Sequence, residues 1–103
     1  MSWTEDEIQA VWNKGEKVPD YSEDLYRKDQ CGAWIRRDKY GDRDDNEGWE
    51  IDHITPVSKG GTDKLSNLRP LQWKNNAGRG DERLTTIVTS KGLINVCKDD
   101  DAA

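Results

Sequence analysis

The chain has few apolar residues, and tryptophan is prominent among them. Hydrophobic residues make up 32% of the 103 positions and charged residues 36%, and there is no phenylalanine. Segments with so little apolar content are often disordered, but disordered segments rarely contain many aromatic residues. The five tryptophans and three tyrosines therefore predict one small folded domain over residues 1–103, with a core that depends on tryptophan.

The lack of a long apolar run and the presence of just two cysteines exclude several classes of protein. No apolar run approaches the roughly 20 residues that a membrane span requires, and no basic and then apolar leader is present. We therefore expect a cytoplasmic protein with no membrane partner. Cys31 and Cys97 are too few and too far apart for a disulfide framework or a four-cysteine zinc site.

The net charge of −5 argues against a nucleic-acid partner when the chain is taken as a whole. Residues 53–83, however, carry six bases and three acids, which is a local charge of +3. The acids gather in residues 1–26, in residues 42–52 and in the acidic tail, residues 98–103. DNA binds to a local basic surface, so the overall negative charge of the chain does not exclude DNA binding.

Capping and periodicity predict a small α+β fold. A capping box at Thr4 is followed by apolar residues at helical spacing, which predicts an N-terminal helix over residues 5–14. The other expected elements are a helical turn at 22–26, strands at 31–40, 49–54 and 67–71, a helix at 73–83, and a C-terminal β-hairpin of residues 84–89 and 93–97.

The chain's only histidine, His53, follows Asp52 in the strand predicted at 49–54. Side chains alternate between the two faces of a strand, so Asp52 and His53 share a site only if the strand ends or bulges there, as Pro56 indicates. Asn67 follows His53 by fourteen residues, and Asn76 follows Asn67 by nine. A lone histidine at a strand end is usually structural or solvated, but here these polar residues are expected to converge at one end of a hairpin.

The segment IDHITPVSKGGTDKLSNLRPLQWKNNAGRGD resembles the HNH endonuclease motif in its His-Asn-Asn variant. The shared features are Asp-His, a proline, a Gly-Gly loop, Asn-Leu, and an asparagine on the final helix followed by small and basic residues. The resemblance is strong over the motif core, residues 49–83, and weak over 27–48. It implies a ββα-metal (His-Me finger) core, in which two strands and a helix hold one divalent cation.

The resemblance also implies roles for individual residues. Asp52 and Asn76 are the expected metal ligands, His53 the general base, and Asn67 the residue that holds the loop and orients the imidazole. An imidazole, with an unperturbed pKa of about 6.5, suits proton transfer near neutrality, and oxygen ligands favour Mg²⁺ or Mn²⁺ over zinc. The expected phosphate contacts are Lys59, Lys74, Arg79 and Arg69.

The sequence departs from the family at the structural zinc site. Many relatives carry two C-x-x-C pairs there, and the matching positions in this chain are Cys31 with Trp34 and Gln72 with Asn75. One cysteine cannot form a four-cysteine site, so we expect no structural zinc. We expect packing among three tryptophans to take its place: Trp34, Trp49 and Trp73.

Two polar residues next to predicted site residues can be interpreted in more than one way. Asn75 competes with Asn76 for the place on the final helix, but the nine-residue offset favours Asn76 and leaves Asn75 as a surface amide. Glu50, two residues before Asp52, fits either a carboxylate that supports the site residues from behind or an exposed strand acid, and the exposed strand acid is the preferred interpretation.

The combined expectation is a metal-dependent endonuclease that hydrolyses phosphodiester bonds and, as a monomer, nicks double-stranded DNA. An alternative is a non-catalytic DNA-binding or partner-assembly module on the same fold, which the acidic net charge favours. A toxin nuclease held by an immunity protein is a third hypothesis. The residues identify no protein partner.

Overall fold

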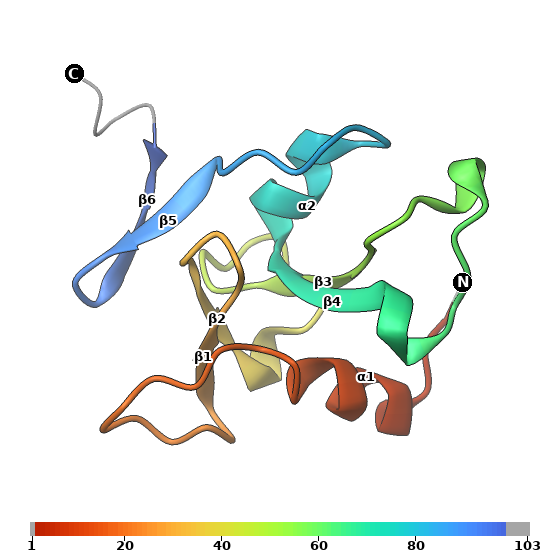
Figure 1. Ribbon diagram of the computed structural model, residues 1–103. Helices are drawn as coiled ribbons and strands as arrows, with labels where there is room; N and C mark the ends of the chain where they lie inside the picture. The colour runs from red at the N-terminus through yellow and green to blue at the C-terminus, as the bar shows by residue number, and fades with distance from the viewer. Residues whose placement is uncertain (1, 99–103) are drawn as a thin grey trace.

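The computed structural model describes residues 2–98, which form two helices, three short 3₁₀ turns and three antiparallel strand pairs (Figure 1). In chain order the elements are α1 (Glu5–Trp12), β1 (Tyr26–Lys28), β2 (Trp34–Arg36), η1 (Arg37–Lys39), β3 (Trp49–His53), η2 (Val57–Lys59), η3 (Leu65–Asn67), β4 (Leu68–Gln72), α2 (Trp73–Arg79), β5 (Val88–Lys91) and β6 (Ile94–Cys97). The strands pair as β1–β2, β3–β4 and β5–β6. The predicted acidic tail lies outside the described residues, except for its first position.

Helix α1 begins as its capping box predicts. The Thr4 hydroxyl accepts a hydrogen bond from the Glu7 amide, and the Glu7 carboxylate accepts one from the Thr4 amide. The helix ends at Trp12, earlier than the predicted residue 14. Its buried face carries Ile8, Val11 and Trp12, so α1 is amphipathic and covers one side of the central hairpin.

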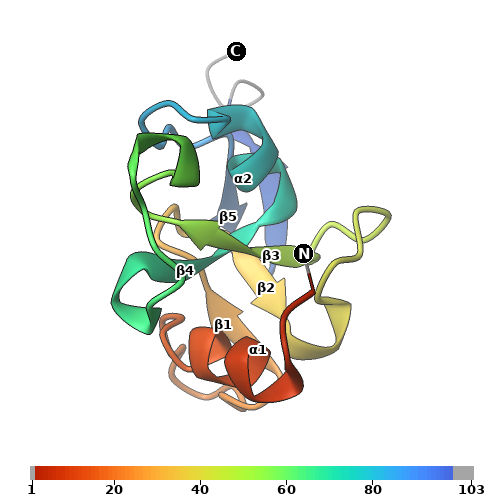
Figure 2. The same cartoon turned by 90° about the vertical axis from the view of Figure 1, so that its right-hand side faces the viewer.

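The central hairpin is β3–β4, whose register pairs Trp49 with Gln72 and His53 with Leu68. Figures 1 and 2 show α1 on one side of this hairpin and α2 on the other. The main core lies between α1 and the hairpin, and its buried members are Ile8, Val11, Trp12, Ile35, Trp49 and Leu68. The hairpin is therefore anchored on its apolar side, which leaves its α2 side available for polar residues.

Helix α2 follows β4 without a loop and is shorter than predicted. The Gln72 side chain accepts hydrogen bonds from the backbone amides of Lys74 and Asn75, which caps the helix N-terminus. The helix ends at Arg79 rather than at residue 83, because Gly80 has a positive φ of 53°. The helix therefore presents just two turns to the hairpin.

The pair β1–β2 differs from the prediction. Tyr26–Lys28, expected to end or follow a helical turn, forms β1 and pairs with β2. The strand predicted at 31–40 is reduced to Trp34–Arg36, because Gly32 has a φ of 83° and a 3₁₀ turn begins at Arg37. The local pattern missed β1 because its pairing with β2 is a tertiary contact.

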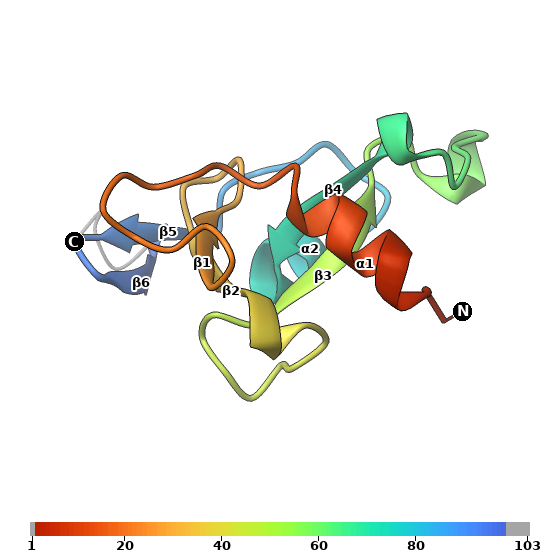
Figure 3. The ribbon, with the colours of Figure 1, turned by 90° about the horizontal axis from the view of Figure 1, so that it is seen from below.

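The C-terminal hairpin β5–β6 forms near its predicted place, although β5 begins at Val88 instead of residue 84. Figure 3 shows it at the end of the molecule opposite the start of α1, beside β1. Asn95 fixes it there: its side chain accepts a hydrogen bond from the Trp34 amide and donates one to the Trp34 carbonyl.

The prediction that three tryptophans pack together is wrong. Trp34 contacts Tyr21 and Tyr26, whereas Trp49 contacts Trp12 and Tyr40. Trp73 lies beneath two cationic side chains, those of Arg43 and Lys74. Because the three rings belong to different elements, each stabilises a separate junction.

Neither described helix is long and apolar enough to cross a membrane.

Candidate active site

A pocket of about 270 Å³ lies between the end of β3, the η2 turn and α2. Asp52 and His53 line it from β3, and Asn76 and Arg79 line it from α2. Consecutive strand residues normally point to opposite faces. Both Asp52 and His53 reach this pocket because His53 is the last residue of β3. The structure thus brings together three of the four residues predicted for catalysis and metal binding.

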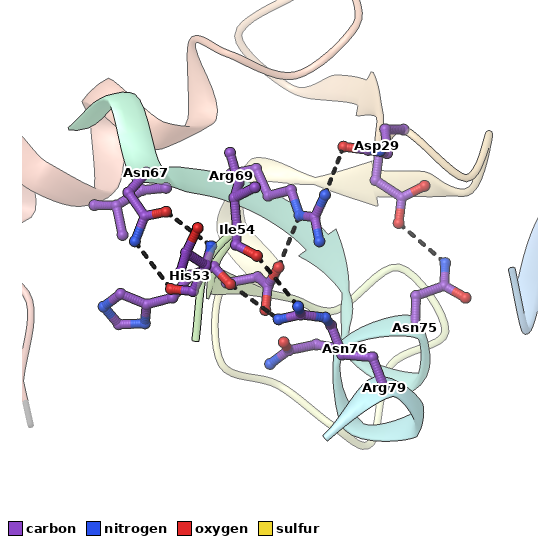
Figure 4. A network of polar contacts seen from close by, with 12 residues as sticks. Asp29, His53, Ile54, Asn67, Arg69, Asn75, Asn76 and Arg79 are labelled. Carbon is purple, nitrogen blue, oxygen red and sulfur yellow. Dashed lines mark hydrogen bonds and ion pairs between the residues drawn. The ribbon is translucent and has the colours of Figure 1, made fainter. Parts of the chain in front are cut away.

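Asp52 is held between two arginines. Its side chain is buried, with the residue 5% exposed. Oδ1 accepts a hydrogen bond from Arg79 Nη1 at 2.9 Å, and Oδ2 accepts one from Arg69 Nε at 2.7 Å. Figure 4 shows Arg69 approaching from β4 and Arg79 from α2. The two arginines predicted as phosphate contacts are therefore engaged with the carboxylate in this structure.

Arg79 also closes the end of β3. Besides Asp52, its guanidinium donates to the backbone carbonyls of His53 and Ile54, at 2.9 and 3.2 Å (Figure 4). Its Nε is buried and has no hydrogen-bond partner within the described part of the chain. Arg79 is thus a structural link between α2 and the strand that carries the predicted base.

Asn76 is oriented by Glu50. Asn76 Nδ2 donates to Glu50 Oε1 at 2.8 Å, and over residues 2–98 no hydrogen bond is made to Asn76 Oδ1. This arrangement leaves an amide oxygen as an available ligand.

Glu50 is not an exposed strand acid, which corrects the preferred sequence interpretation. Its side chain is 19% exposed and accepts two hydrogen bonds from Arg43, at 2.7 and 2.8 Å, besides the one from Asn76. Burial raises the pKa of Glu50, but the hydrogen bonds from Arg43 and Asn76 outweigh it and lower the pKa below its ordinary value. Strand alternation predicts that Glu50 and Asp52 share one face, and this was the available signal.

The His53 ring has two neighbours that the sequence interpretation missed. Its Nε2 lies 2.7 Å from Asp63 Oδ1, and its ring centroid lies 5.7 Å from that of Trp3. Asp63 lies two residues after the Gly-Gly pair, so an acid within the motif was the available signal. Trp3 gave no such signal, because its contact depends on where α1 packs.

Asn67 holds the loop that follows β3 but does not touch the imidazole. Its Oδ1 accepts from the Thr55 amide at 2.8 Å, and its Nδ2 donates to the Thr55 and Thr62 carbonyls at 3.1 and 2.8 Å (Figure 4). Gly61 permits this closure, since a Cβ there would lie 1.7 Å from the Thr55 carbonyl oxygen. Any effect of Asn67 on the ring of His53 must therefore pass through the loop.

The two lysines predicted as phosphate contacts lie in different places. Lys59 Nζ donates to the Asp81 carbonyl at 3.0 Å, and the neighbouring Ser58 hydroxyl donates to the Asp81 carboxylate. Ser58 and Asp81 line the pocket, and Lys59 lies beside them without lining it. Lys74 Nζ lies 5.4 Å from the centroid of the Trp73 ring and is not part of the pocket lining.

A buried polar cluster includes Gln72 and Asn75, two of the four positions that the sequence resemblance matches to zinc ligands. Asp29, which is buried, accepts hydrogen bonds from the Gln72 amide and from Asn75 Nδ2, besides two other backbone amides. Asn75 also bonds the backbone of Ile87 and Val88. Asn75 is 0% exposed, so the expectation of a surface amide is wrong. Burial raises the pKa of Asp29, although its four hydrogen bonds oppose that shift.

Asp52 and Asn76 line the pocket with oxygen atoms of the type that hard divalent cations bind. Asp52 supplies carboxylate oxygens that each accept one hydrogen bond and keep a further lone pair, and Asn76 supplies an amide oxygen. Mg²⁺ and Mn²⁺ bind such oxygens and keep several water ligands. Within residues 2–98 no group of three or more histidine, cysteine or acidic side chains is arranged to hold a metal. A cation would also share Asp52 with two guanidinium groups, which opposes its binding.

A family model described as HNH endonuclease matches residues 31–81 of the chain. The matched range begins before β2 and contains every residue of the pocket lining. Searches of curated proteins and of solved structures found no match.

Proposed function

Because the chain belongs to the HNH endonuclease family, we propose that it is a metal-dependent endonuclease that hydrolyses phosphodiester bonds in double-stranded DNA. The observation that supports this most directly is the shared pocket of Asp52, His53 and Asn76. These are an acid, a base and an amide drawn from two elements, and they occupy the positions that the motif assigns to ligand, base and ligand.

In this proposal β3, β4 and α2 are the ββα-metal core. The hairpin supplies Asp52 and His53, and α2 supplies Asn76 on the facing side. Asp52 and Asn76 would hold one divalent cation, Mg²⁺ or Mn²⁺. When bound, such an ion stabilises charge on the scissile phosphate and on the leaving oxygen.

His53 supplies the base. Its imidazole takes a proton from a water molecule, which then attacks the phosphorus atom, and base catalysis of this kind typically contributes a factor of about 10²–10⁴. Asn67 keeps the loop after β3 closed, so that the ring stays beside the pocket. A single site of this kind cuts one strand at a time, so the monomer is expected to nick.

Arginines beside the pocket supply the contact with the DNA backbone. A neighbouring hollow of about 450 Å³ is lined by Arg69, Arg79 and Arg83, and it shares Arg79 with the pocket. Guanidinium groups pair well with phosphate oxygens. We propose that the backbone runs from this hollow to the pocket rim at Lys59, whereas Lys74 contributes through a more distant phosphate.

The binding of Asp52 by two arginines favours a second candidate, a DNA-binding or partner-assembly module without catalysis. In such a module the arginines would neutralise Asp52 permanently, and no cation would enter. The fold and the basic hollow would remain.

Incubation of supercoiled plasmid with the protein separates the two candidates. We expect conversion to the open-circular form in Mg²⁺ or Mn²⁺ and none in EDTA. A mobility shift of the DNA without nicking in any metal would contradict the enzyme and select the module.

A further inference from the structure

We propose that Asp63 is a positioning residue for His53, an inference that rests on the proposed nuclease function. The carboxylate Oδ1 lies 2.7 Å from His53 Nε2, within hydrogen-bond range. The Asp63 side chain is 50% exposed and that of His53 is 21% exposed. Asp63 therefore reaches from the loop surface to the ring without being part of the core.

The partner at Nε2 determines which nitrogen acts as the base. An ionised carboxylate only accepts hydrogen bonds, so Nε2 must carry the hydrogen in this contact. In the neutral ring Nδ1 is then unprotonated and can accept a proton. Nδ1 has no hydrogen-bond partner within residues 2–98. Asp63 thus makes Nδ1 the nitrogen that accepts a proton, and it prevents a 180° flip of the imidazole ring.

The loop around Asp63 is built to hold this geometry. Asn67 Nδ2 donates to the carbonyl of Thr62, the residue immediately before Asp63, at 2.8 Å. Gly61 allows the loop to close against Thr55. Asn67 therefore acts on His53 through the position of Asp63, which links the first asparagine of the His-Asn-Asn motif to the base.

A second contact restrains the ring from another element. Trp3, just before α1, packs against the imidazole at 5.7 Å between ring centroids, with the planes tilted by 43°. Asp63 fixes the ring through a directional hydrogen bond, whereas Trp3 restricts its movement by packing. Only removal of Asp63 should change which nitrogen is protonated.

Nitrogen-15 NMR of the imidazole tests this without any need for activity. His53 is the only histidine, so the spectrum of the metal-free protein above neutral pH contains one ring. We expect the Nε2–H tautomer alone in the wild type and a mixture of both tautomers in Asp63→Ala. Asp24→Ala, the same change at an exposed acid distant in sequence from the site, should leave the spectrum as in the wild type. An unchanged tautomer in Asp63→Ala, or an Nδ1–H tautomer in the wild type, would overturn the proposal.

Cleavage kinetics provide the second readout. Asp63→Ala should lower kcat by about tenfold to a hundredfold with KM within about twofold, because ring orientation acts on the chemical step. Asp63→Glu should recover part of that loss, and Asp24→Ala should cleave as the wild type does. If Asp63→Ala keeps wild-type kcat, the positioning role is wrong while the nuclease stands. If the wild type does not cleave at all, the nuclease proposal fails, and the NMR comparison still decides whether Asp63 sets the tautomer.

Discussion

The Arg79 guanidinium donates to the Asp52 carboxylate over 2.9 Å, and this contact joins α2 to the end of β3. Both side chains are buried. In the proposed enzyme, Asp52 also binds a cation, so the arginine and the metal compete for one carboxylate. The same contact thus stabilises the metal-free fold and opposes metal binding.

Replacement of Arg79 should separate these two effects. In EDTA, Arg79→Met should lower the free energy of unfolding by about 3 kcal/mol, because it leaves a buried carboxylate with one partner fewer. It should also bind Mn²⁺ at least about tenfold more tightly, a difference of about 1.4 kcal/mol. Isothermal titration calorimetry and urea denaturation measure the two quantities.

The matched control for that experiment is Lys17→Met, which removes an exposed cation. It should change neither the Mn²⁺ affinity nor, beyond about 0.5 kcal/mol, the stability. Equal Mn²⁺ affinity in Arg79→Met and wild type would show that the arginine does not compete with the metal.

Glu50 should make stability depend on pH in the acid range. Its pKa is lowered in the folded protein by hydrogen bonds from Arg43 and Asn76, despite burial. The unfolded chain therefore binds a proton at higher pH than the native one, and the stability that Glu50 contributes is present above pH 4.5 and lost as pH falls through the native pKa.

Glu50→Gln tests that dependence by removing the titrating group. In EDTA at pH 7 it should be less stable than the wild type by about 1 kcal/mol, since charge-assisted hydrogen bonds to a half-exposed arginine are lost. The difference should shrink as pH falls below 4.5. A difference that stays constant from pH 7 to pH 3 would contradict the assignment.

Adjacent asparagines on α2 provide a direct comparison of structure with function. Asn75→Ala should lower the free energy of unfolding by about 2–4 kcal/mol, because it leaves Asp29 and the Val88 backbone short of partners in a buried cluster. Asn76→Ala should cost about 1 kcal/mol or less but abolish metal-dependent cleavage. Thermal denaturation and plasmid nicking distinguish them, and the reverse assignment of the two effects would contradict the proposed ligand.

The sequence was sufficient to predict the parts of the fold that carry local signals. The capping box placed the start of α1, and alternation followed by Pro56 placed β3 and its end, which is why Asp52 and His53 share the pocket. The nine-residue offset of the family motif favoured Asn76, which lines the pocket from α2 beside these residues. These features are local because caps, strand period and turn residues act over a few positions.

The missed features are pairings between distant segments. Contacts of Asp52 with Arg69 and Arg79 require the packed hairpin and helix, and the Trp3 contact with His53 requires α1 in place. The polar cluster around Asn75 replaced the expected tryptophan packing, since amides and a carboxylate can satisfy one another when buried. No periodicity in the sequence distinguishes that solution from an apolar one.

The most direct test of the account is the rate at which His53→Ala nicks supercoiled plasmid in Mn²⁺. Circular dichroism and Mn²⁺ titration should first show that the variant folds and binds metal as the wild type does. We predict a rate at least about a thousandfold lower than that of the wild type. Nicking by His53→Ala at the wild-type rate would contradict the account.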